Sequence, residues 1–251
     1  MLLDGKTAVI YGGGGSIGRA MATAFAREGA HVFLAGRTQG TLDAAAEALR
    51  AGGGTVDTAV VDALDEAAVD AHAADVVART GRLDVSVNVI GVNDVQGTPL
   101  AEMPVDDFLS PIATATRTQF LTARAAAREM ITQGSGVILF FGGSGDPVRD
   151  YSIGGFQIAL EAIEALRRQL ASELGKFGVR AVSLRTGGIA ETLPDDFPGV
   201  EDIVATIEGP TLLGRTATLA DVGNVAAFVA SDRAASITGA AINISCGAMF
   251  D

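Results

Sequence analysis

A glycine-rich turn near the N-terminus carries the residues best suited to bind a phosphate group. Residues 7–20 read TAVIYGGGGSIGRA, in which an apolar run precedes four glycines and an alanine-containing helical pattern follows. A strand, turn and helix in this order gather bare backbone N–H groups at the positive end of a helix dipole, which suits a pyrophosphate. Gly12, Ser16 and Gly18 give the spacing G-x3-S-x-G, close to a dinucleotide-binding turn. A flexible surface loop is the alternative, and the flanking strand and helix favour the binding turn.

The rest of the chain alternates short apolar runs with helical patterns. Runs rich in Val, Ile and Phe recur, and alanine and leucine at helical spacing separate them, which is typical of βαβ units and a parallel sheet in an α/β fold. The predicted strands are Thr7–Tyr11, His31–Ala35, Val56–Val60, Leu83–Asn88, Val137–Phe141, Val179–Leu184 and Ala240–Ile244. The helices predicted between them include Ser16–Glu28, Thr41–Ala51, Glu66–Arg79, Glu161–Lys176 and Leu219–Ala230.

Length and composition predict one domain over residues 1–251 with a sizeable core. No composition break or Pro/Ser-rich linker divides the 251 residues, of which 48% are hydrophobic and 19% charged. A net charge of -12 opposes a nucleic-acid partner, because phosphate backbones are held by Lys and Arg. There is no run of 18 apolar residues and no charged-then-apolar leader, so we expect a cytoplasmic protein without a membrane partner.

Cysteine and histidine offer little chemistry. The single cysteine, Cys246, excludes an internal disulfide and leaves no cysteine cluster for a metal, and we expect it to be a small apolar filler. His31 and His72 are expected at a strand start and on a polar helix face, as bystanders. No metal is predicted.

Several landmarks resemble, in order, those of the short-chain dehydrogenase/reductase family. The turn Gly12-x3-Ser16-Ile17-Gly18 resembles the family's cofactor turn, Asp62 its adenine-contacting aspartate, and residues 88–91 the Asn-Asn-Ala-Gly after its fourth strand. Residues 178–180, 213–215, 231–232 and 237–239 and Gly247 resemble its later landmarks. The resemblance spans the whole chain and implies a single Rossmann-fold domain with a doubly wound, seven-stranded sheet. It also implies a nicotinamide cofactor across the carboxyl ends of the strands and, commonly, a homodimer or homotetramer.

The resemblance implies the following cofactor-binding residues: Gly12, Gly15, Ser16, Ile17, Gly18, Arg37, Thr38, Asp62, Asn88, Gly91 and Ile189. In a Rossmann unit, an acid after the second strand holds the ribose 2′-hydroxyl of NAD, whereas an arginine accommodates the 2′-phosphate of NADP. Here Arg37 and Thr38 follow the second strand, with no acid. Arg37 can make a bidentate, charge-assisted contact with a phosphate, so NADP(H) is favoured over NAD(H). The alternative is that Arg37 only caps a solvated helix start.

The chain departs from the family at its catalytic residues. The family's chemistry uses an Asn, Ser, Tyr and Lys, in which the Lys lowers the pKa of a Tyr that is near 10 when unperturbed. Aligned on residues 163–168, these positions fall on Ala115, Gly143, Phe156 and Leu160. A slip of one residue would put Ser144 at the serine position, but no lysine stands between Val148 and Ile163.

Two hypotheses follow. In the first, the protein transfers hydride and takes its proton from Ser144, Tyr151, Asp146 or water, with Ser144 and Tyr151 as the catalytic candidates. In the second, the fold serves as a cofactor-binding regulatory or partner subunit, or as a non-redox catalyst. For Tyr151, exposed packing in a loop is the alternative to catalysis.

The connection from Gly187 to Gly214 lacks a clear strand and holds three prolines, which predicts a substrate lid. It contains no Lys or Arg and six acids: Glu191, Asp195, Asp196, Glu201, Asp202 and Glu208. Such a lid would not attract the phosphates of an acyl carrier or CoA, so we expect a neutral or cationic, apolar small-molecule substrate such as a carbonyl, imine or activated alkene. A solvated acidic face is the alternative. Phe140, Phe141, Phe156 and Phe197 could line an apolar pocket or belong to the core.

Overall fold

Seven parallel strands form one sheet in the order β3-β2-β1-β4-β5-β6-β7. The computed structural model describes residues 1–143, 151–193 and 199–250. The strands are β1 Thr7–Tyr11, β2 His31–Gly36, β3 Thr55–Val60, β4 Val85–Asn88, β5 Gly136–Gly142, β6 Val179–Thr186 and β7 Ala241–Ile244. The strand order reverses between β1 and β4, where a doubly wound sheet opens a crevice at its carboxyl edge.

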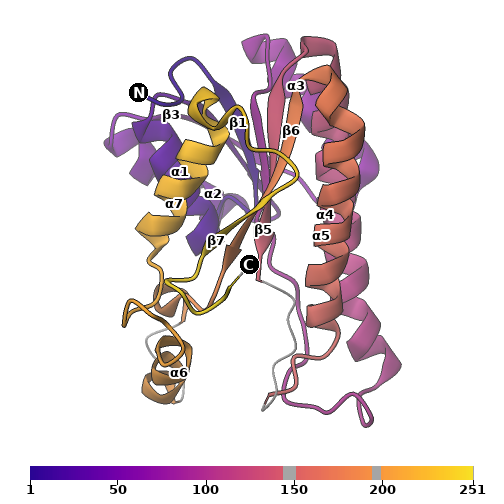
Figure 1. Cartoon of the computed structure of the whole chain (residues 1–251). Helices are drawn as coiled ribbons and strands as arrows, with labels where there is room; N and C mark the ends of the chain where they lie inside the picture. Colours follow the sequence, from indigo (N-terminus) through magenta and orange to yellow (C-terminus); the bar gives the residue numbers. More distant parts are fainter. Residues whose placement is uncertain (144–150, 194–198, 251) are drawn as a thin grey trace.

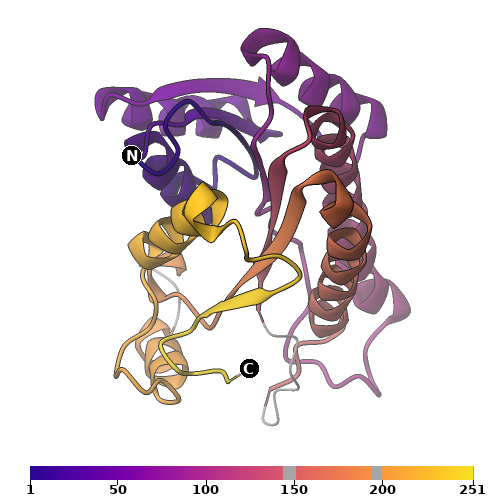
Figure 2. The same cartoon turned by 45° about the horizontal axis from the view of Figure 1, so that its top comes forward.

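Helices cover both faces of the sheet (Figures 1 and 2). The helices are α1 Ser16–Arg27, α2 Gln39–Ala51, α3 Glu66–Thr80, α4 Val105–Gln133, α5 Gly155–Leu174, α6 Val200–Glu208 and α7 Leu219–Ala230. Helices α1, α2 and α7 share one hydrophobic core with the sheet, and α3, α4 and α5 share the other. No helix in the described ranges is long and apolar enough to cross a membrane.

Alternating side chains of the strands feed the two cores. In β1, Ala8 and Ile10 pack under α1 and α2, while Val9 and Tyr11 pack under α3 and α4. Because parallel strands are buried on both faces, β1 reads as a continuous apolar run. These two cores confirm the predicted α/β Rossmann fold with seven parallel strands.

The predicted elements differ from the structure mainly at their ends. Helix α5 begins at Gly155, six residues before the predicted start at Glu161. A side chain at Gly155 would collide with the backbone of Phe108, so the glycine permits close contact between α5 and α4. The prediction that His72 lies on a polar helix face is wrong. His72 lies on the inner face of α3 beside Tyr11, with 7% of its surface exposed.

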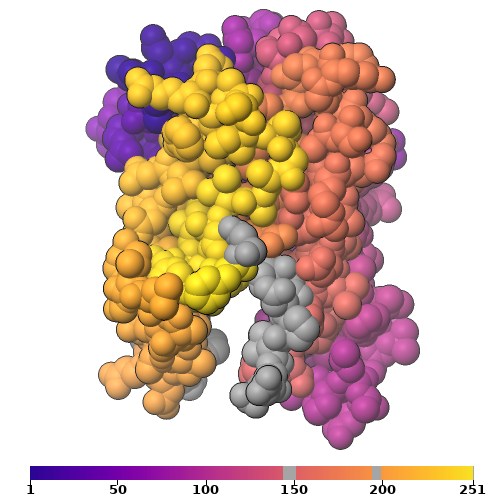
Figure 3. Space-filling view, in the orientation of Figure 1, coloured from indigo at the N-terminus to yellow at the C-terminus, as the bar shows by residue number. Residues whose placement is uncertain are grey.

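The carboxyl edge of the sheet carries the irregular segments. Beyond β6, the connection from Gly187 to Gly214 contains a short 3-10 turn, Ala190–Thr192, and the helix α6. Figure 3 shows that this face of the molecule is hollowed at its lower edge, beside α6. The glycine-rich turn between β1 and α1 lies at the same edge of the sheet, because all seven strands run in parallel.

Candidate functional site

Two pockets adjoin at the carboxyl edge of the sheet. The first, here called the turn pocket, has a volume of about 390 Å³ and is lined by the glycine-rich turn and the ends of β2, β3 and β4. The second, here called the apolar pocket, has a volume of about 580 Å³ and lies between α4, α5 and the segment after β6. Val89, Ile90, Gly91 and Thr118 line both pockets, so one elongated ligand could occupy the two together.

The glycine-rich turn is held close to the sheet and to its own helix. Gly12 has a φ of +84°, and a Cβ atom there would lie 2.8 Å from the carbonyl oxygen of Val89. A side chain on Gly18 would collide with the carbonyl oxygen of Gly12. Only glycine fits these two positions, because a Cβ atom at either would displace backbone. At Gly12 the positive φ is a second reason, since other residues rarely adopt it.

The N-terminus of α1 has free hydrogen-bond donors. Gly15 precedes the helix and has no side chain to cap it, and the N–H groups of Ser16, Ile17 and Gly18 meet no acceptor among the described residues. Uncapped donors at the positive end of a helix dipole bind anions. Gly15 lines the turn pocket, whereas Ser16 and Ile17 line the apolar pocket. The residues present therefore fit a pyrophosphate at the junction of the two pockets.

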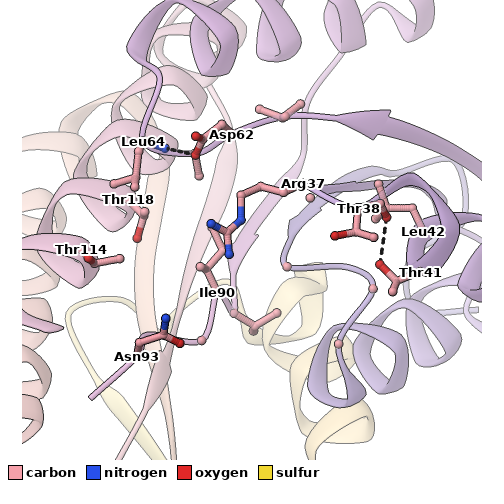
Figure 4. Close-up of a pocket in the computed structure, with 18 of the residues that line it drawn as sticks. Arg37, Thr38, Thr41, Leu42, Asp62, Leu64, Ile90, Asn93, Thr114 and Thr118 are labelled. Carbon is pink, nitrogen blue, oxygen red and sulfur yellow. Dashed lines mark hydrogen bonds between the residues drawn. The ribbon is translucent and has the colours of Figure 1, made fainter. Parts of the chain in front are cut away.

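Arg37 is an unpaired cation in the turn pocket. Its guanidinium points into the pocket, between Asp62 and Ile90 (Figure 4). Arg37 forms no hydrogen bond or ion pair with any residue that the structure describes. Thr38 lines the same pocket, and its hydroxyl does not cap α2. These two side chains are thus available for a polar ligand group next to β2.

Asp62 and Asn88 have different surroundings. Asp62 lines the turn pocket, where its Oδ1 accepts a hydrogen bond of 3.0 Å from the backbone N–H of Leu64 (Figure 4). Asn88 is buried and lines neither pocket. Its side-chain amide donates to the hydroxyl of Thr122 at 3.1 Å and accepts from the N–H of Ile90 at 3.0 Å. Asn88 therefore fixes the loop that presents Ile90 and Gly91 to both pockets.

The four positions that the sequence comparison predicts for the family's catalytic residues lie together in the structure. Ala115, Gly143, Phe156 and Leu160 all line the apolar pocket, as does Ile189 from the segment after β6. Of the phenylalanines predicted to line a pocket, Phe141 does so too, whereas Phe140 is core, with 1% of its surface exposed. Phe197 lies outside the described residues.

The chain has only two lysines and two tyrosines, and the structure describes all four. Lys6 pairs with Asp232 at 3.2 Å and with Asp84 at 3.7 Å, near the amino edge of the sheet, and Lys176 lies over the ring of Phe177 beyond the end of α5. Tyr11 is enclosed in β1, where burial raises the pKa of its phenol. None of these three residues lines the apolar pocket.

Of the two hydroxyl residues predicted as catalytic, the structure describes only Tyr151. Tyr151 is 51% exposed and lines neither pocket among the described residues. Ser144 and Asp146 lie outside the described residues. Gly143, which precedes Ser144 in the sequence, lines the apolar pocket.

A buried ion cluster stands beside the apolar pocket and was missed by sequence reasoning. Glu164, one turn after Leu160 on α5, accepts hydrogen bonds from Arg167 at 3.0 Å and from Arg185 of β6 at 2.8 Å. Burial opposes ionisation of Glu164, but hydrogen bonds from Arg185 and Arg167 hold its pKa below the usual value. The i,i+3 spacing of Glu164 and Arg167 is a signal for their pairing, but nothing local points to Arg185.

The sequence and the fold are similar to those of known proteins over nearly their whole length. Residues 13–249 match a protein-family model described as Enoyl-(Acyl carrier protein) reductase. An uncharacterized oxidoreductase of Bacillus subtilis (strain 168), YxbG, is 31% identical over 253 residues, which cover 98% of this chain and 92% of that protein.

Two solved structures show the likeness in three dimensions. A short-chain type dehydrogenase/reductase from Mycobacterium ulcerans superposes with a TM-score of 0.88 at 26% identity, covering 99% of this chain and 91% of that one. A gluconate 5-dehydrogenase from Burkholderia cenocepacia J2315, in complex with NADP and tartrate, superposes with a TM-score of 0.86 at 26% identity, covering 98% and 96%.

Proposed function

Because the chain belongs to the short-chain dehydrogenase/reductase family of oxidoreductases, we propose that it transfers hydride between NADP(H) and an apolar small molecule, neutral or cationic. The observation that carries this proposal is the junction of the two pockets: the turn pocket offers phosphate-binding groups, and the apolar pocket shares four lining residues with it. NADP(H) supplies the hydride when it is bound. The chain's own residues bind the cofactor, orient it and enclose the substrate.

The preference for NADP(H) rests on Arg37 and Thr38. A carboxylate at this position would repel a 2′-phosphate, whereas the unpaired guanidinium of Arg37 would bind it. The uncapped N–H groups of Ser16, Ile17 and Gly18 would hold the pyrophosphate. Gly12 and Gly15 would let the backbone approach it, and Asp62, Gly91 and Ile189 complete the proposed cofactor site. Asn88 would act on the cofactor only indirectly, by fixing the loop that presents Gly91.

The segment 187–214 is proposed as a substrate lid. Gly188, Ile189 and Thr192 line the apolar pocket, and α6 follows them in the chain. The description of the matched family model names an acyl carrier protein as part of the substrate. The segment 187–214, however, has six acids and no Lys or Arg, and its negative charge would repel a phosphate-bearing carrier. We therefore propose a small carbonyl, imine or activated alkene as substrate.

Proton delivery must differ from the family's Asn-Ser-Tyr-Lys arrangement if Ala115, Gly143, Phe156 and Leu160 occupy those positions. None of these four side chains can donate a proton. We keep Ser144 and Tyr151 as the proposed donors for substrates that require one, with water as the remaining source. Loss of a positioned acid costs about 10²–10⁴-fold in rate, which slows a reductase without preventing hydride transfer.

Calorimetric titration with NADPH and NADH tests the cofactor assignment. A scan for NADPH oxidation over small carbonyls, imines and activated alkenes then tests the activity. Tight binding of NADPH together with turnover of any of these classes supports the proposal. Absence of binding to either nucleotide refutes it.

The second candidate is a cofactor-binding partner subunit or a non-redox catalyst. The apolar lining at the four catalytic positions favours it, because an inactive partner needs no proton donor. Copurification with an active homologue and NADPH binding without turnover would distinguish this role. Assembly of the chain only with itself, as a homodimer or homotetramer, would favour the enzyme.

A further inference from the structure

The apolar pocket lacks an acidic donor among the residues that the structure describes. Its lining contains no Tyr, Lys, Arg, His or Cys, and its one ionisable side chain is Asp94. A carboxylate accepts protons and hydrogen bonds but donates none. The other polar side chains of the lining are the hydroxyls and amides of Ser, Thr and Gln, which can donate hydrogen bonds but are weak general acids.

Most of these hydroxyls and amides already donate to the protein itself. Thr118 donates to the carbonyl oxygen of Ala115 at 3.2 Å, and Thr192 to that of Ile189 at 2.7 Å. Gln119 donates to the carbonyl oxygen of Asn88 at 3.2 Å, and Gln96 to Asp94. An oxyanion that formed in this pocket would therefore find few free donors, although such donors are what usually stabilises developing negative charge.

The reaction that fits such a pocket produces no anion. Hydride addition to a carbonyl leaves an alkoxide, which must be protonated. Hydride addition to an iminium ion gives a neutral amine, so that the iminium cation and NADPH become a tertiary amine and NADP⁺. The C–H bond of the nicotinamide breaks, a new C–H bond forms at the iminium carbon, and the π electrons become the nitrogen lone pair. Positive charge passes from substrate to nicotinamide, and no proton is taken up or released.

We propose that the substrate of this site is an organic cation of the iminium class, an inference that rests on the proposed hydride-transfer function. The charges of the lining agree with it, because Asp94 is a carboxylate and no cation opposes it among the described lining residues. The aromatic rings of Phe141 and Phe156 also line the pocket, and an organic cation can bind over the face of such a ring. The acids Glu201, Asp202 and Glu208 of α6 give the neighbouring segment the same sign.

The test compares three substrates of similar shape with the full chain and NADPH. These are N-methyl-3,4-dihydroisoquinolinium, which carries a permanent charge, neutral 3,4-dihydroisoquinoline, and the ketone 1-tetralone. NADPH oxidation and product formation are followed from pH 6 to pH 9, and the rate without protein is subtracted. We expect kcat/KM for the iminium to exceed that for the ketone by at least about 10²-fold. We also expect its kcat to vary less than twofold with pH, since no proton enters the step.

Binding provides a readout that is independent of turnover. N,N-dimethyl-1,2,3,4-tetrahydroisoquinolinium cannot accept a hydride, and its affinity for the NADP⁺-loaded protein is measured by calorimetry against that of neutral tetralin. We expect the cation to bind at least tenfold more tightly. Asp94→Asn should remove that advantage and raise KM for the iminium more than it lowers kcat. Glu47→Gln, on the exposed side of α2, removes the same charge away from both pockets and should change neither value.

Each outcome decides the question. Turnover of the iminium at a pH-independent rate, together with tight binding of the cation, supports the inference. If NADPH binds but 1-tetralone is reduced as fast as the iminium, or the iminium is not reduced at all, the inference is overturned and the cofactor assignment stands. If neither NADPH nor NADH binds, the proposed function fails, and this inference fails with it.

Discussion

Leu160 packs against Gly143 at the wall of the apolar pocket, so that a Cβ atom added to Gly143 would lie 3.3 Å from a terminal methyl group of Leu160. Leu160 belongs to α5, and Gly143 directly follows β5. In our alignment they hold the places of the family's Lys and Ser. Their contact matters because the leucine occupies space that a larger residue at position 143 would need.

Restoring all four family residues should create carbonyl reduction. In the variant Ala115→Asn/Gly143→Ser/Phe156→Tyr/Leu160→Lys, a cation would stand one helical turn from a phenol and lower its pKa. We expect kcat/KM for 1-tetralone to rise about 10²-fold, the usual contribution of a general acid. The matched control keeps Leu160, because a phenol without a neighbouring cation keeps a pKa near 10. A variant that folds and binds NADPH but gains nothing would show that our alignment is wrong.

Arg37→Asp should reverse the cofactor preference. The guanidinium has no partner among the described residues, so its full charge is available to a 2′-phosphate, whereas an aspartate would repel it and hold a 2′-hydroxyl. Loss of a charge-assisted contact is worth about 1.5–3 kcal/mol, or roughly 10- to 150-fold in affinity for NADPH. Calorimetry with NADPH and NADH measures both changes. Arg168→Asp, an exposed position on α5, is the charge-matched control. Unchanged relative affinities would remove the basis for NADP(H).

The fold could be predicted from local patterns because burial on both faces of a parallel sheet leaves continuous apolar runs. Thr7–Tyr11 and Leu219–Ala230 have the predicted ends. The early start of α5 could not be predicted, because Gly155 reads as a helix breaker until Phe108 of α4 is known to approach it. His72 was misplaced for a similar reason: a ring can turn inward where a partner such as Tyr11 is present, and that partner is far away in sequence.

Site residues could be predicted where their position depends only on neighbouring residues in the sequence. They could not be predicted where their side-chain contacts depend on elements that are distant in the sequence. Gly12 and Arg37 stand next to strands, so strand prediction alone places them at the carboxyl edge. Asn88 is also a strand-end residue, but its amide turns inward to Thr122, which only the packing of α4 determines. The pairing of Glu164 with Arg185 likewise depends on how α5 lies over β6.

Gly12→Ala and Gly15→Ala should separate folding from phosphate binding. Gly12 has a positive φ, and a Cβ there would overlap the carbonyl group of Val89, so its replacement should cost about 1–3 kcal/mol of stability. Gly15 has a φ of -80°, and a Cβ there would meet nothing closer than 3.5 Å. Gly15→Ala should therefore keep the wild-type Tm and lose affinity for NADPH, because its methyl group would lie in the turn pocket. Equal Tm losses in both variants would contradict this assignment.

Glu164→Gln should destabilise the protein in a pH-dependent way. The pKa of Glu164 is lower in the folded state than in the unfolded state. The ionised carboxylate therefore stabilises the fold fully above the unfolded-state pKa, near 4.3, and this stabilisation is lost as the pH falls through the folded-state pKa. Removal of the charge leaves Arg167 buried with an uncompensated charge, which should cost about 3 kcal/mol at neutral pH. Urea unfolding between pH 3.5 and pH 8 should show the difference from wild type shrinking below about pH 4.3. Glu161→Gln, exposed on the same helix, is the control and should show no such trend.

Tyr151→Phe tests whether Tyr151 supplies the proton for carbonyl reduction, a proton that iminium reduction does not need. The phenol is half-exposed and lines neither pocket, so it would have to approach the substrate to deliver a proton. If carbonyl reduction takes its proton from Tyr151, the variant should lower kcat for 1-tetralone at least tenfold. Reduction of the permanently charged iminium requires no proton, and its kcat should stay within twofold of wild type. Because both rates are measured on one preparation, a fall in the iminium rate as well would reveal a structural defect, and full activity on both substrates would leave Ser144 or water as the donor.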